Sequence, residues 1–141
     1  MSYKAGLGYL VTSAQVANTG APINIFVVTG LVCVTAVFSR IAVESGANAC
    51  GWEFDPTAGT ASQPLCATGD INVGVLGDYV SITETAGVAT LTTGGAVAMG
   101  SPRKYFLPAG ILTFVNAAAD GSLVHNLFYI PITAGSRVTL S

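Results

Sequence analysis

Charged side chains are scarce in this chain. Only 9% of its 141 residues are Asp, Glu, Lys or Arg, against roughly 25% in an average soluble protein. Apolar residues make up 51%, and the mean hydropathy is +0.64. Because charged groups keep copies of a soluble monomer apart, we expect much of this surface to be buried, either against other protein chains or in a membrane.

An uninterrupted apolar run of membrane-spanning length is also missing. No charge occurs between Lys4 and Arg40, and residues 23–39 are largely apolar. A spanning helix needs about 20 such residues, whereas this run contains several polar residues and a central Thr29-Gly30 pair. Its Val, Ile and Phe residues favour a pleated strand over a helix. The run therefore predicts two buried strands joined by a turn, and we expect no membrane contact.

Groups for catalysis are few and dispersed. His125 is the one histidine, and strand alternation places it on a face with Leu123, Leu127 and Tyr129, as a packed or interfacial side chain. No Gly-x-Ser-x-Gly elbow and no metal-ligand spacing occurs. We therefore predict no catalytic residue, no metal site and no cofactor. A paired-carboxylate site remains open as an alternative, with four candidate residues: Glu53, Asp55, Asp70 and Glu84.

Clustered cations and paired cysteines are lacking as well. Five scattered basic residues and a net charge of −2 argue against nucleic-acid binding, which needs a basic patch. Three cysteines, an odd number, do not form a disulfide framework. Cys50 and Cys66 flank a predicted hairpin loop, so we expect them on adjacent strands, reduced in a protein made in the cytoplasm.

Turn-forming residues, by contrast, are frequent and spaced as in a β protein. It holds 17 glycines and 6 prolines, and no apolar stripe of helical spacing lasts beyond two turns. Turns recur about every eight to twelve residues, which favours an antiparallel β-sandwich or jelly roll. The predicted strands are residues 23–28, 31–43, 49–54, 64–71, 79–83, 88–92, 96–99, 105–107, 111–116 and 123–130.

Two regions of that domain have different expected roles. Residues 1–22 are rich in Gly, Ala and Thr, so we predict an extended N-terminal arm, with a short strand at 8–12, that acts on a neighbouring chain, ahead of a sandwich spanning 23–141. The candidate partner contacts are Tyr3, Leu7, Tyr9, Leu10, Val11, Trp52 and Phe54. The expected core comprises Val34, Val37, Phe38, Leu112, Phe114, Leu127 and Phe128.

Several segments resemble small structural proteins of tailed bacteriophages. They are residues 28–38 (VTGLVCVTAVF), 55–60 (DPTAGT) with 65–71 (LCATGDI), and 108–111 (PAGI) with 127–132 (LFYIPI). The resemblance implies a virion protein, especially a head-decoration (cement) protein. Such a protein would form a homo-oligomer, with a trimer favoured, and bind the major capsid protein on the head surface. The alternative is a trimeric tail-fibre or receptor-binding module; an enzyme comes third.

Overall fold

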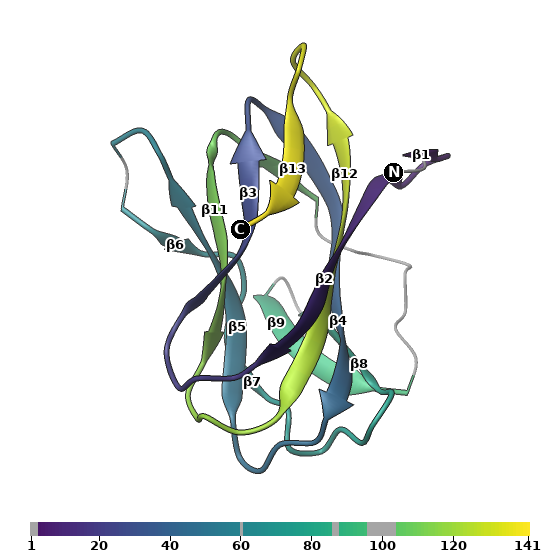
Figure 1. Cartoon of the computed structure of the whole chain (residues 1–141), viewed down its shortest axis with the longest axis vertical. Helices are drawn as coiled ribbons and strands as arrows, with labels where there is room; N and C mark the ends of the chain where they lie inside the picture. Colours follow the sequence, from purple (N-terminus) through teal and green to yellow (C-terminus); the bar gives the residue numbers. More distant parts are fainter. Residues whose placement is uncertain (1–2, 60, 86–87, 96–103) are drawn as a thin grey trace.

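The computed structural model describes residues 3–59, 61–85, 88–95 and 104–141, and these form two packed antiparallel sheets without a helix (Figure 1). The predicted all-β sandwich is therefore confirmed. Within the same ranges, no helix has the length and apolar character to cross a membrane. The strand expected at 96–99 lies outside the described residues.

The seven-stranded sheet has the order β1-β2-β12-β4-β8-β9, and β10 also pairs with β4. Its centre is β4, in which every residue from Val32 to Val37 is buried, as the apolar character of both its faces predicted. The strands are β1 (Tyr3–Lys4), β2 (Gly8–Ala17), β4 (Val32–Val43), β8 (Tyr79–Thr85), β9 (Val88–Gly94), β10 (Tyr105–Leu107) and β12 (Ser122–Pro131).

The six-stranded sheet has the order β13-β3-β11-β5-β6, and β7 also pairs with β5. The predicted turn at Thr29-Gly30 connects the two sheets, because it joins β3 to β4. Gly30 has a φ of 71°, and a Cβ there would lie 2.8 Å from Cβ of Ser136, so glycine is required. The strands are β3 (Ile23–Thr29), β5 (Ala49–Pro56), β6 (Gln63–Pro64), β7 (Gly69–Asp70), β11 (Gly110–Asn116) and β13 (Arg137–Leu140).

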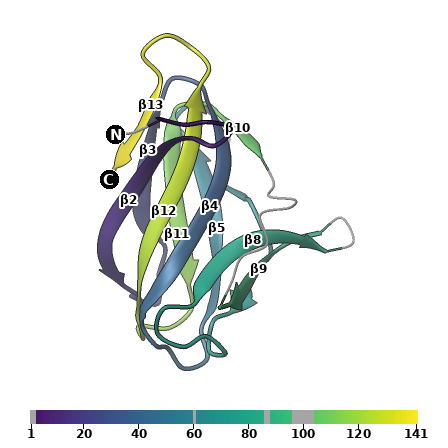
Figure 2. The ribbon, with the colours of Figure 1, turned by 90° about the vertical axis from the view of Figure 1, so that its right-hand side faces the viewer.

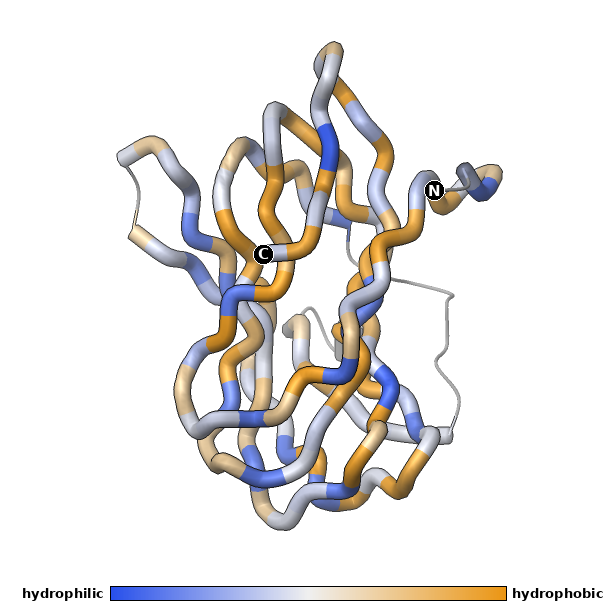
Figure 3. Tube along the Cα trace, in the orientation of Figure 1, coloured by the Kyte–Doolittle hydropathy of each residue, from blue (hydrophilic) through white to orange (hydrophobic). Residues whose placement is uncertain are grey.

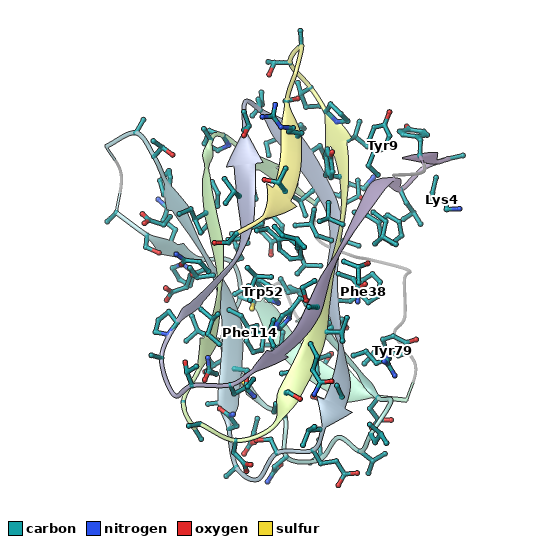
Figure 4. The ribbon with its side chains drawn as sticks, viewed as in Figure 1. Lys4, Tyr9, Phe38, Trp52, Tyr79 and Phe114 are labelled. Carbon is teal, nitrogen blue, oxygen red and sulfur yellow. The ribbon has the colours of Figure 1, made fainter. Side chains whose placement is uncertain are left out.

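A cluster of rings fills the space between the sheets. The Trp52 ring lies 6.0 Å from Phe26 and 5.1 Å from Phe114, centroid to centroid. All three side chains are buried, and Figure 4 shows Trp52 and Phe114 between the two sheets. In Figure 3 the hydrophobic segments of the chain lie mainly along the strands that enclose this space. The core is therefore built from residues that alternate inward on both sheets.

The predicted core is right for five residues and wrong for two. Val34, Val37, Leu112, Phe114 and Leu127 are buried. By contrast, Phe38 and Phe128 are only half-buried. They lie on the outer face of the seven-stranded sheet, because each directly follows an inward residue on its strand.

The N-terminal segment is a strand of the sandwich rather than an arm outside it. From Tyr9 to Ala17, β2 pairs with β12. Val11 is buried in the core. Gly8, the first residue of β2, has a φ of 92° and lies so close to the main chain of Tyr129 that a Cβ there would overlap it. The strand predicted at 8–12 is present and extends to Ala17, but its partner is β12 of the same chain and not a neighbouring chain as expected. Main-chain pairing with β12 and burial of Val11 therefore anchor this segment in the sandwich.

One lateral side of the sandwich is closed by main-chain hydrogen bonds. Between β6 and β7, the N–H of Leu65 donates to the carbonyl of Trp52 at 2.8 Å. The N–H of Ala67 donates to the carbonyl of Ala89 at 2.8 Å, and the N–H of Leu91 to that of Ala67 at 3.2 Å. Because Trp52 and Ala89 belong to different sheets, the closing segment (residues 65–70) joins the two.

The cysteines are buried free thiols. Cys50 lies in β5, and Cys66 lies in the closing segment beside it, where its Sγ would be 3.8 Å from a Cβ at Gly51. Burial raises the pKa of Cys50 to about 12 and also raises the pKa of Cys66. Both side chains therefore act as small core residues near neutral pH.

Removing the Phe114 ring should destabilise the protein strongly. We expect Phe114→Ala to lower the free energy of unfolding by roughly 3–5 kcal/mol, because it leaves a cavity beside Trp52. Phe128→Ala is the matched control, and its cost should be clearly smaller since that ring is half-buried. Urea unfolding of both variants measures the difference. Equal costs would contradict the assignment of Phe114 to the core and of Phe128 to the outer face of its sheet.

Deleting residues 2–17 should unfold the domain. Without β2, the edge of β12 loses its main-chain partner and the core loses Val11. Circular dichroism should show loss of the β signal and of a cooperative melt. Deleting only residues 2–5 removes β1 and should leave the melt nearly unchanged. A cooperative melt after the longer deletion would show that β2 is dispensable.

Candidate interaction surface

The candidate carboxylates do not gather into one site. Within the described residues, no group of three His, Cys, Asp or Glu side chains is placed to hold a metal ion. Glu53 and Asp55 lie on the outer face of the six-stranded sheet, opposite Thr113 and Ile111 of β11. Glu84 belongs to β8 of the other sheet. The four residues considered for a paired-carboxylate site are therefore divided between separate elements.

Three aspartates hold loops together. Asp70 Oδ1 accepts hydrogen bonds from the N–H groups of Asn48 at 2.9 Å and Asn72 at 3.0 Å, and these bonds lower the pKa of its carboxyl. Asp78 Oδ2 accepts one from the N–H of Val75 at 3.1 Å. These carboxylates therefore have structural partners. Asp120 Oδ2 accepts one from the N–H of Gly46 at 2.7 Å, across to another loop.

The one histidine is a core residue. His125 is fully buried, with its ring 4.5 Å from Phe114 and 5.2 Å from Trp52. Its Nδ1 lies 2.7 Å from Oγ of Ser39. Its Nε2 has no hydrogen-bond partner among the described residues. Burial lowers the pKa of His125 to about 3, so the ring is neutral near pH 7. It shares its face with Leu123, Leu127 and Tyr129, as predicted, and all four side chains are buried.

The predicted contacts of the N-terminal segment differ in exposure. Tyr3 is 53% exposed, and its ring lies 5.1 Å from that of Tyr9. Leu7, Tyr9 and Leu10 are half-buried. Val11 is buried between the sheets, so it is not available to a partner. Tyr3, Leu7, Tyr9 and Leu10 remain candidates for contact with a partner.

Trp52 and Phe54 point inward. Their exposed fractions are 1% and 5%, and only Glu53 between them faces outward on β5. Trp52 is therefore not an exposed contact, because the alternation of β5 directs it into the core. Phe54 contributes only to the wall of a groove beside β10.

That groove is uncharged and opens at the side of the molecule. It has a volume of about 540 Å³ between β10 and the loop that joins β5 to β6. Its apolar lining includes Phe54, Leu65, Phe106, Leu107 and Pro108. Phe106 is 71% exposed. The groove brings together residues that are about fifty positions apart in the sequence, so local sequence patterns did not predict it.

Aromatic rings cross the outer face of the seven-stranded sheet. The Phe38 ring stacks on Phe128 at 6.1 Å and lies 6.2 Å from Tyr79. Strand pairing places Leu10 opposite Phe128, so the patch covers β2, β12, β4 and β8 (Figure 2). Figure 4 shows Phe38 and Tyr79 on the side away from Trp52. We call Leu10, Phe38, Tyr79 and Phe128 the aromatic face.

No family model, curated protein or solved structure matches this chain. Its function is therefore inferred from its own surfaces. Of these, the aromatic face and the groove are the two apolar features described above, whereas the outer face of the six-stranded sheet holds Glu53, Asp55 and Arg137.

Acid should destabilise the protein through His125. Above pH 6.5 the ring is neutral in both states, so its contribution to stability is complete. Below pH 6.5 the unfolded state binds a proton that the folded state binds only near pH 3. The free energy of unfolding should therefore fall by up to about 1.4 kcal/mol per pH unit.

Urea unfolding between pH 7 and pH 4.5 measures this slope above the range in which Asp70 titrates. His125→Gln keeps a polar side chain beside Ser39 without the titration, and its stability should stay nearly flat over this window. A flat profile for the unchanged protein would contradict a buried neutral histidine.

Proposed function

We propose that this chain is a structural protein of a bacteriophage virion: a head-decoration protein that binds the capsid shell as a homo-oligomer, with a trimer favoured. The observation that supports this most is the aromatic face. Three rings and a leucine occupy the outer surface of a sheet in a chain with very few charges. Aromatic side chains are enriched in protein interfaces, where they often supply much of the binding energy.

Burial of this face against another protein is energetically favourable. Removing apolar surface from water contributes roughly 25 cal/mol per Å², and half-buried rings on a sheet lose little conformational entropy when they are covered. The resemblance to phage structural proteins supports the same role. The major capsid protein is the partner we propose for the oligomer, on the head surface.

An open strand edge offers a second means of attachment. β1 pairs only with Gly8 and Tyr9, and no other strand of the described chain pairs with that edge of β2. An extended segment of a partner can add to such an edge through main-chain hydrogen bonds. Repetition of these contacts over a capsid lattice makes weak single contacts strong together. The protein would act mechanically, by raising the free energy needed to separate shell subunits.

Disrupting the aromatic face should weaken assembly. Light scattering at micromolar concentration should give a mass above that of one chain for the unchanged protein. Phe38→Asp, which places a charge between Phe128 and Tyr79, should reduce self-association or binding to phage heads at least tenfold. Glu53→Gln, on the outer face of the other sheet, is the control and should behave like the unchanged protein.

Co-sedimentation with separated heads and tails tests the location. Binding to heads at hundreds of copies is the result expected of a decoration protein. Binding to tails alone would favour the fibre or receptor-binding role instead. If the unchanged protein is monomeric and binds neither, the proposal fails.

A further inference from the structure

The loop between β7 and β8 exposes three large aliphatic side chains within four residues. Val73 is 74% exposed, Val75 57% and Leu76 64%. Single exposed aliphatic residues are ordinary, but a group of them marks an interaction site. We call residues 71–78 the aliphatic loop. It lies at the lower end of the molecule in Figures 1 and 2, and hydrophobic colouring reaches the lower right of Figure 3.

The aliphatic loop is held in one conformation by hydrogen bonds to β4 and to the residue that follows β4. The N–H of Leu76 donates to Oε1 of Glu44 at 3.0 Å, and the N–H of Gly77 donates to the carbonyl of Ile41 at 2.9 Å. Gly74 packs so closely on Ile41 that a Cβ there would overlap its side chain. Because the loop is already ordered, burying its side chains in a partner costs little conformational entropy.

The groove beside β10 has the complementary character. It is uncharged and apolar, and its volume of about 540 Å³ is within the range of cavities that enclose whole ligands, so it has room for several aliphatic side chains. It lies toward the upper end of the molecule, where β10 is labelled in Figure 2. The loop and the groove of a single chain are therefore well separated and cannot fill each other.

Charge at the two ends is complementary as well. Glu44, Asp70, Asp78 and Asp120 lie around the aliphatic loop and the neighbouring loops of the lower end. Arg40 is exposed beside the same loop, opposite Tyr79, so among the described residues this end has four acidic residues against one basic residue. Lys104 is exposed and directly precedes β10 at the groove. Opposite charges at the rims of an apolar contact orient the partners and raise the rate of association.

We infer that the aliphatic loop of one copy inserts into the groove of a second copy. This contact rests on the proposed homo-oligomer and names its interface. It joins two different surfaces, so it is heterologous and repeats from copy to copy. Such a contact closes into a ring when its rotation allows, and a ring of three is the closed form that agrees with a trimer.

A mixing experiment with two variants tests the inference. Val75→Asp combined with Leu76→Asp replaces two of the three exposed aliphatic side chains of the loop by charges and leaves the groove unchanged. Ala58→Trp fills the groove but leaves the loop, and Phe106→Asp is a second groove variant at an exposed residue. Each change lies on the surface, and circular dichroism melts should confirm folding. Each variant alone should self-associate at least tenfold more weakly than the unchanged chain, measured by analytical ultracentrifugation.

The mixture gives the decisive result. A loop variant and a groove variant should form a dimer of one chain each, because together they have one intact loop and one intact groove. The control is Thr139→Asp, at an exposed position of β13 on the edge of the six-stranded sheet, and this variant should assemble normally. If the mixture stays monomeric, or if each variant assembles as the unchanged chain does, the inference is overturned.

The same data separate this inference from the proposed function. Normal assembly of the loop and groove variants, together with loss of assembly in Phe38→Asp, would overturn the loop–groove contact and leave self-association through the aromatic face intact. A monomeric unchanged chain would overturn both.

Discussion

Packing of the Trp52 ring between the two sheets is the contact on which the rest of the structure depends. Trp52 comes from β5 of one sheet and packs on His125 of β12 in the other. Side chains alternate along a strand, so fixing these two residues inward sets the direction of their neighbours. Glu53 is thereby placed outside on one sheet, and Phe128 outside on the other. The charged outer face of the six-stranded sheet and the aromatic face are both consequences of one buried contact.

Much of the fold could be predicted because its signals are local. The turn at Thr29-Gly30 marks strand ends by residue type, and β11 and β12 were predicted within one residue at each end. Alternation also placed His125 on one face with Leu123, Leu127 and Tyr129, all of which are buried. Strand β13 was missed because four residues with two apolar members give too short a pattern.

The errors have a common physical origin in long-range pairing. β4 is apolar on both faces, so its period of two does not tell which face is the core, and Phe38 was assigned to the wrong one. β2 is anchored by main-chain bonds to β12, more than a hundred residues away. The groove likewise combines β5 with β10. Contacts of this kind leave no trace in a local sequence pattern.

The closing segment has a consequence for mechanical load. Hydrogen bonds from Leu65 to Trp52, and between Ala67 and both Ala89 and Leu91, connect the two sheets at one side. A force that pulls the sheets apart must stretch these bonds at the same time as it opens the ring cluster. A force along the strands would instead shear them in parallel. A load applied to one sheet is therefore transmitted to the other sheet through backbone hydrogen bonds, and not only through side-chain packing.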